Sequence, residues 1–146
     1  NGVKFYFNKL DLKKKIRPVN RLDKDTSGLV IFAKNEYVQE SLVKQMKNKE
    51  FIKEYIAICD GKLENSKGTI NAPITRKDNS IIERCVSDIG DIAITHYEVL
   101  KSYTNYTAIK CILETGRTHQ IRVHMAHIGH PLLRRYFIWY LLFSNS

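Results

Sequence analysis

The sequence predicts an α+β domain with a mixed, largely antiparallel sheet and a few flanking helices. Two long segments, 91–103 and 105–116, alternate apolar and polar residues, and the polar turn around Asn105 between them is typical of a hairpin. Helical spacing of apolar residues is found over 36–49 and 118–128. Strands and helices therefore occur in mixed order, which favours α+β.

The N-terminal half begins with a segment, 1–18, that we expect to be basic and irregular, with a strand-like stretch at its start. Residues 29–33 form a continuous branched apolar run, which predicts a strand buried on both faces. Asn35 has the side chain of an N-cap residue, and the spacing predicts a helix from there to about Lys49.

Three further elements follow. The alternation over 51–61 predicts a strand with Tyr55, Ala57 and Cys59 on one face. The stretch 64–80 is expected to be a loop region around a short strand. We expect the last helix to begin with Thr118 as its N-cap and to stop at Gly129.

Composition limits the class of protein. The chain has 146 residues, 43% of them apolar, and a formal net charge of +9, which suits one domain with a polyanionic partner, RNA or DNA before a membrane. The three cysteines are far apart and odd in number, so we expect free thiols in a reducing cytoplasm. The longest apolar run is too short to span a bilayer, and no leader peptide is recognisable.

A charged turn directly before the apolar run is the first candidate for chemistry. Asp23 stands between Arg21 and Lys24, which would keep it ionised as a nucleophile or base, and Thr26 can hydrogen-bond the turn. The alternative interpretation is a surface turn with a solvated ion pair.

The second candidate lies between Arg117 and His130, where two arginines and four histidines occur close together. On the predicted helix Arg122 could point into a cleft and pair with a carboxylate from another element. The histidines raise a zinc alternative, but no HExxH pattern or completing ligand is present, so hydrogen bonding to backbone, RNA or the core edge is favoured. Tyr55, taken alone, is typical of a packing residue in a strand.

Taken together, "RLDKDTSGLVIFAKN", "KEYIAICDG" and "GRTHQIRVHMAHIGHP" resemble, in order and spacing, the three signature segments of the RluA-type RNA pseudouridine synthases. The resemblance implies a partial pseudouridine synthase catalytic fold. It implies that Asp23 is the catalytic aspartate, that Tyr55 stacks on the base and removes a proton, and that Arg122 ion-pairs Asp23. The family usually has His where this chain has Asn20. RNA contacts are expected from Asn20, Arg21, Lys24, Thr26, Arg117 and His119.

The implied activity is isomerisation of uridine to pseudouridine in structured RNA, with ribosomal RNA favoured and transfer RNA as a further candidate. The resemblance implies no cofactor and no metal. We expect a cytoplasmic monomer with no membrane contact and no obligate protein partner. Two alternatives are a catalytically inactive, basic RNA-binding fragment of the same fold and a metal-dependent hydrolase built on the histidines.

The chain departs from the family at both ends. We assign 1–133 to the catalytic domain, with the N-terminal part of the fold missing, and 134–146 to a tail unlike the family. If residues 134–140 are encoded AGG AGA TAT TTT ATA TGG TAT, removing the first base yields Gly-Asp-Ile-Leu-Tyr-Gly, the family's usual continuation. A one-base shift after Leu133 is therefore our hypothesis, and we expect open sheet edges and reduced stability from it.

Overall fold

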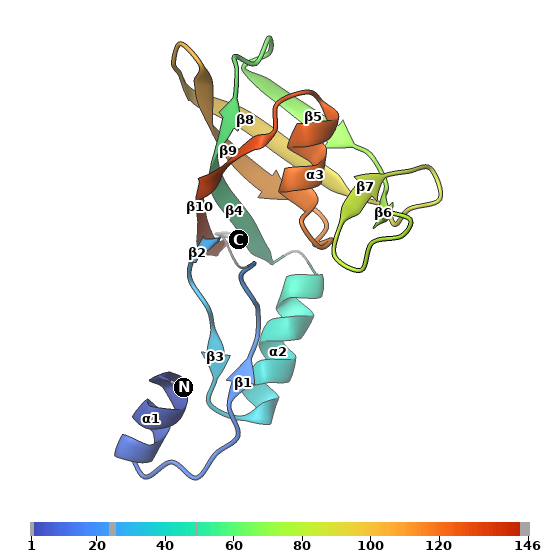
Figure 1. The fold of residues 1–146 in the computed structure, drawn as a ribbon. Coiled ribbons are helices and arrows are strands. Elements are labelled where there is room, and N and C mark those ends of the chain that lie inside the picture. Colours follow the sequence, from blue (N-terminus) through green and yellow to red (C-terminus); the bar gives the residue numbers. More distant parts are fainter. Residues whose placement is uncertain (1, 24–25, 49, 144–146) are drawn as a thin grey trace.

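The computed structural model describes residues 2–23, 26–48 and 50–143. Its centre is a curved six-stranded sheet in the order β2-β10-β4-β9-β8-β5, in which only the β2–β10 pair is parallel. The α+β prediction with a largely antiparallel sheet is confirmed (Figure 1). The helices and strands, in chain order, are α1 Gly2–Lys9, β1 Arg17–Pro18, β2 Ser27–Gly28, β3 Phe32–Ala33, α2 Glu36–Lys47, β4 Phe51–Asp60, β5 Lys67–Asn71, β6 Ile74–Arg76, β7 Arg84–Val86, β8 Ile94–Ser102, β9 Tyr106–Leu113, α3 Gln120–His127 and β10 Leu132–Phe143.

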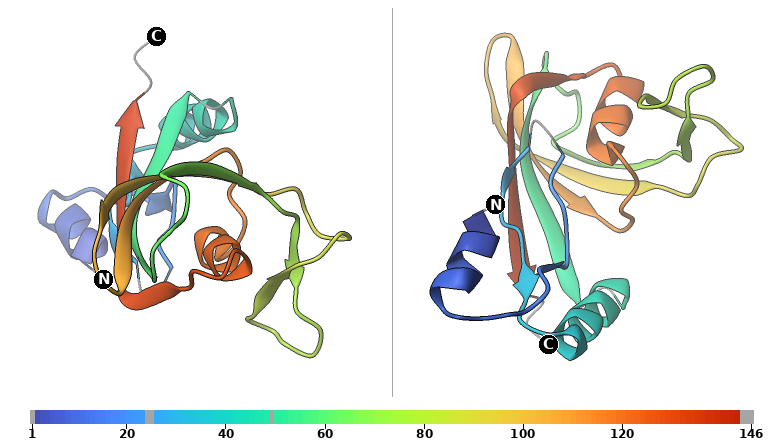
Figure 2. Two further views of the ribbon diagram at one scale, coloured as in Figure 1. Left: turned by 90° about the horizontal axis from the view of Figure 1, so that it is seen from above. Right: turned by 60° about the horizontal axis from the view of Figure 1, so that its bottom comes forward.

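The core lies between the sheet and α3. Figures 1 and 2 show α3 in the hollow of the curved sheet. Ile121 and Met125 of α3 are buried together with Ala57 of β4 and Ile109 of β9. Burial of both Ala57 and Cys59 agrees with the prediction that they share one face of the 51–61 strand, and this face points to the core. Helix α3 and the central strands thus form one packed unit, which holds the side chains around it in fixed positions.

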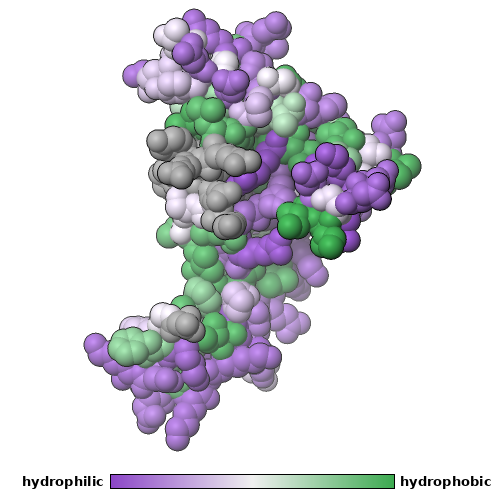
Figure 3. All heavy atoms as spheres, in the orientation of Figure 1, coloured by the Kyte–Doolittle hydropathy of each residue, from purple (hydrophilic) through white to green (hydrophobic). Residues whose placement is uncertain are grey.

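The N-terminal part leaves this unit as an extended hairpin. β1 pairs with β3, α2 packs beside them, and the tip of the hairpin reaches the sheet, where β2 pairs with β10 (Figure 1). The predicted cap of α2 is confirmed, because Asn35 Oδ1 accepts the Val38 N–H at 2.8 Å. Hydrophobic surface lies at the narrow waist of the molecule in Figure 3.

Three sequence expectations are wrong. The stretch predicted to be irregular contains helix α1. The run 29–33 is not a strand buried on both faces, since Leu29 is 56% exposed and only Phe32–Ala33 is strand. The last helix begins at Gln120, not after a Thr118 cap. The second error arises because apolar composition alone does not tell which residues face solvent.

The segment after Leu133 continues as β10, whose backbone pairs with β4 from Phe137↔Ala57 to Phe143↔Phe51. The expectation of an open edge is therefore wrong for β4, which has β10 on one side and β9 on the other. Residues 144–146 of the predicted tail lie outside the described residues. The domain boundary at 133 and the frame shift stay predictions.

Candidate active site

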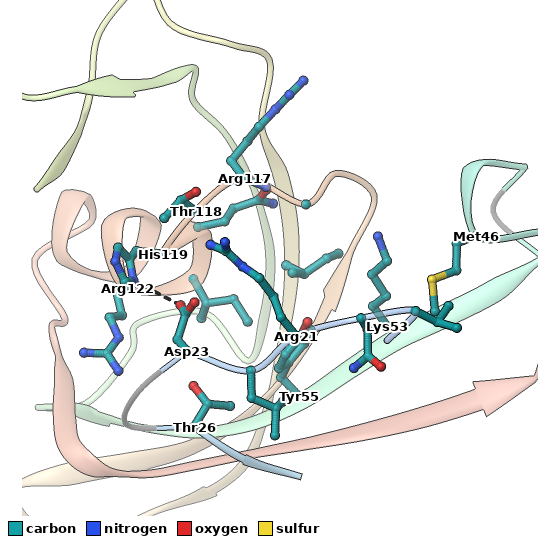
Figure 4. Close-up of a pocket in the computed structure, with 17 residues that line it drawn as sticks. Arg21, Asp23, Thr26, Met46, Lys53, Tyr55, Arg117, Thr118, His119 and Arg122 are labelled. Atoms are coloured by element: carbon teal, nitrogen blue, oxygen red, sulfur yellow. Dashed lines mark hydrogen bonds and ion pairs between the residues drawn. The ribbon is translucent and has the colours of Figure 1, made fainter. Parts of the chain in front are cut away.

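A cavity of about 390 Å³ opens between the hairpin tip, β4 and the loop before α3 (Figure 4). The three residues predicted to be catalytic, Asp23, Tyr55 and Arg122, all line it. The predicted RNA contacts that line it are Asn20, Arg21, Thr26, Arg117 and His119. Lys24 lies outside the described residues. The structure thus brings together side chains that are far apart in the sequence.

The hairpin tip is fixed by an asparagine. The Ile31 N–H donates to Asn20 Oδ1 at 2.8 Å, and Asn20 Nδ2 donates to the Leu29 carbonyl at 2.9 Å. Through these bonds the Asn20 side chain joins the two arms of the hairpin between the β1–β3 pair and the sheet. A turn closes below them, because the Thr26 N–H donates to the Asp23 carbonyl at 3.0 Å. The carboxylate of Asp23 is therefore mounted on a braced loop. The RNA-binding role of Asn20 stays a prediction.

Asp23 has a partner that the sequence did not predict. An ion pair joins Asp23 Oδ2 to His119 Nδ1 at 3.0 Å. Because a carboxylate only accepts hydrogen bonds, Nδ1 of the ring carries the proton and donates. Both side chains are a little over a quarter exposed. Arg122 lines the same cavity, and its ion pair with Asp23 stays a prediction.

His119 faces the carboxylate because the backbone reverses at this residue. Its φ of 57° and ψ of 23° are left-handed, and it is the N-cap of α3 without a side-chain cap bond. Histidine is among the residues enriched in this region, although the conformation still costs about 1–2 kcal/mol. The Gln120 side chain accepts the Arg117 N–H at 2.9 Å. Gln120 thus braces the turn that aims His119.

Tyr55 occupies the middle of the sheet. Its strand β4 lies between β9 and β10, and the side chain is half-buried. Burial, and next the negative charge of Asp23, raise the pKa of the Tyr55 hydroxyl to about 12. The phenol is consequently protonated at neutral pH, and it lies close enough to Asp23 to sense that charge.

Cations surround the opening. Arg117 is anchored by its Nε, which donates to the Ile92 carbonyl at 3.0 Å, and by Asp91 at 3.5 Å. In Figure 4 Arg21 extends from the hairpin tip toward the loop that carries Arg117, and Lys53 lies farther along β4. A ring of cations around one carboxylate suits an anionic ligand whose reacting part enters the cavity.

The histidines do not assemble as the zinc alternative requires. Both ring nitrogens of His124 lie on protein partners, Nδ1 at 2.8 Å from Thr95 Oγ1 and Nε2 at 2.9 Å from the Ala72 carbonyl. His130 Nδ1 lies 2.9 Å from the Asp60 carbonyl. Over residues 2–23, 26–48 and 50–143, no group of three or more candidate ligands lies together. No helix in that part of the chain is long and apolar enough to cross a membrane.

Solved structures with a similar fold indicate the class of protein. Human RNA Pseudouridylate Synthase Domain Containing 1 has the same fold, with a TM-score of 0.79 over 97% of this chain and 69% of that one, at 23% identity. Human RNA Pseudouridylate Synthase Domain Containing 4 is also similar, with a TM-score of 0.74 over 88% of this chain and 54% of that one, at 23% identity. These likenesses establish the fold.

Sequence comparison then gives the family. The family model described as RNA pseudouridylate synthase matches residues 2–127, and the chain belongs to this family. The Bacillus subtilis "Uncharacterized RNA pseudouridine synthase YlyB" is 48% identical over 78% of this chain and 38% of the relative. The Haemophilus influenzae "Ribosomal large subunit pseudouridine synthase D" is 45% identical over 79% of this chain and 35% of the relative. The chain therefore spans well under half the length of these two relatives.

Proposed function

We propose that this chain carries the catalytic site of an RNA pseudouridine synthase, which converts uridine to pseudouridine in structured RNA. One observation carries the proposal: a braced carboxylate, Asp23, faces a cavity that also contains a protonated tyrosine and is rimmed by arginines. The cavity volume of about 390 Å³ lies within the range of small-ligand pockets and suits one nucleotide. A base must leave its stack to enter such a pocket.

The chemistry needs only groups that the chain supplies. Asp23 acts as the nucleophile on the uridine, by attack at C1′, by attack at C6, or by starting glycal formation. The bond between N1 and C1′ breaks, the uracil turns, and a bond between C5 and C1′ forms. The hydrogen on C5 leaves as a proton and N1 gains one, so the product is an isomer and no oxidant or reductant takes part.

The roles of the neighbouring residues follow from their contacts. His119 orients the Asp23 carboxylate by its 3.0 Å bond. Tyr55 keeps its proton while Asp23 is ionised, because burial and the Asp23 charge raise its pKa to about 12. Once the charge of Asp23 is consumed in the reaction, the electrostatic part of that increase disappears, so the phenol gives up its proton more easily. The phenol then donates its proton to uracil N1, and the phenolate accepts the proton that leaves C5. Arg21 and Arg117 hold phosphates or the base, and Arg122 is the cation predicted to pair with Asp23.

Ribosomal RNA is the substrate that we favour, because relatives such as the Haemophilus influenzae protein are named for the large ribosomal subunit. The formal net charge of +9 supports a polyanionic substrate but does not separate ribosomal from transfer RNA. We expect the chain to act as a monomer without an obligate protein partner.

The test is pseudouridine mapping. The chain is incubated with total RNA from a synthase-deficient host, and pseudouridines are located by carbodiimide-blocked primer extension. We expect new stops with the unchanged chain and with Asp11→Asn, a matched charge change outside the cavity. No stops are expected with Asp23→Asn. Equal stops with Asp23→Asn would refute the role of Asp23.

A further inference from the structure

A buried hydrogen-bond network underlies the active-site loop and involves residues that have no role in the chemistry above. Its members are Gln120 and His124 of α3 and Thr95 of β8, which are 2%, 0% and 0% exposed. Buried polar side chains are costly unless every group is bonded, so a fully satisfied network fixes one arrangement.

Both the oxygen and the nitrogen of the Gln120 side-chain amide are fully hydrogen-bonded. Oε1 accepts the Arg117 N–H at 2.9 Å and the Thr115 hydroxyl at 2.8 Å. Nε2 donates to the Ile94 carbonyl at 2.9 Å and to Thr95 Oγ1 at 3.0 Å. One side chain therefore ties the loop that carries Arg117 and His119 to strand β8, and His119 in turn holds Asp23.

The Ala72 carbonyl, which bonds His124, determines which atom donates in each bond from His124 through Thr95 to Gln120. The Ala72 carbonyl can only accept, so Nε2 of His124 carries the proton. Burial lowers the pKa of His124, so the ring is neutral and Nδ1 accepts. The Thr95 hydroxyl must then donate to Nδ1, which leaves its lone pairs for the Gln120 amide N–H. The amide oxygen is thereby aimed at the loop rather than at the sheet.

We propose that Gln120 is a positioning residue for the candidate active site, and that Thr95 and His124 fix the orientation of its amide. The inference rests on the proposed function and extends it to residues outside the reacting centre. A loop released from this anchor shifts His119, and with it the Asp23 carboxylate. Misplacement of a reacting group by about 1 Å can lower the rate about 100-fold.

The first test replaces Gln120 with Met, which keeps volume and removes the amide. We expect kcat for pseudouridine formation to fall about 100-fold while KM for RNA changes less than about 3-fold, because the Arg117 side chain keeps its bonds to Ile92 and Asp91 and Arg21 lies on the hairpin. Hydrogen exchange of the Arg117 amide should accelerate in the variant. An unchanged kcat in a folded Gln120→Met protein, or an unchanged exchange rate, would overturn the proposal.

The second test uses a matched pair at Thr95. Thr95→Ser keeps the hydroxyl and should retain activity, whereas Thr95→Val removes it at nearly equal volume and should lower kcat about 10-fold, the effect of about 1.4 kcal/mol. Equal activity of the two variants would contradict the relay. If the unchanged chain forms no pseudouridine, the proposed function fails, and hydrogen exchange of the Arg117 amide still decides whether Gln120 anchors the loop.

Discussion

The bond between His119 and Asp23 offers a prediction that sequence analysis did not contain. His119→Ala removes the ring that lies 3.0 Å from the carboxylate and leaves the backbone reversal in place. A hydrogen bond to a charged group contributes about 1.5–3 kcal/mol. Both side chains are 27–29% exposed, so screening places the value near the lower end. If the bond orients Asp23 in the transition state, kcat falls roughly 10- to 100-fold.

The assay is single-turnover pseudouridine formation at saturating RNA, so that binding does not enter the rate. Backbone strain is separated from loss of the ring by two further variants. His119→Gly suits a φ of 57°, and His119→Asn tolerates this region while keeping a donor. We expect Gly to be as slow as Ala, and Asn to recover part of the rate. Full activity of folded His119→Ala and His119→Gly proteins would refute the orienting role.

Three predictions concern the rest of the molecule. Burial raises the pKa of Cys59, and it raises that of Cys111 to about 12. A thiol reagent at pH 8 should therefore label Cys85 in the native chain and the other two cysteines only after unfolding. Rapid labelling of all three would contradict the buried core. Met125→Ala, at a fully buried position, should lower the free energy of unfolding by about 2–5 kcal/mol in urea, whereas Ile81→Ala at an 84% exposed position should change it little. Burial lowers the pKa of His124, so the unfolded chain binds a proton at a higher pH than the folded chain. The stability that depends on neutral His124 is therefore complete above about pH 6.5 and is lost as the pH falls. His124→Gln should flatten the pH dependence of the urea midpoint between pH 7.5 and 5.5.

Local patterns predicted the elements whose cause is local. The Asn35 cap of α2 and the alternation of β4 depend on residues a few positions apart, and both predictions are confirmed. The run at 29–33 and the start of α3 depend on distant partners. Leu29 lies in the extended hairpin, outside the core between the sheet and α3, and is exposed. Thr118 is not the cap because the backbone is left-handed at His119 and α3 begins only at Gln120.

The site shows the same division. The family resemblance brought Asp23, Tyr55 and Arg122 into one prediction, and all three line the cavity. The bond between Asp23 and His119 was missed, since it depends on a left-handed backbone at His119 that no local pattern indicated. Helical spacing assumed a regular start at Thr118 and therefore gave no sign of this reversal. Only the fold could reveal the bond that joins residues 96 positions apart.

Release of the hydrogen from C5 tests the central claim most directly, because isomerisation must expel it whichever route Asp23 follows. Transcripts of large-subunit ribosomal RNA tritiated at C5 of uridine are incubated with the chain and with Asp23→Asn, and tritium in water is counted. The account predicts release by the unchanged chain and none by Asp23→Asn, with equal RNA binding by both. Equal release from the two proteins would contradict it.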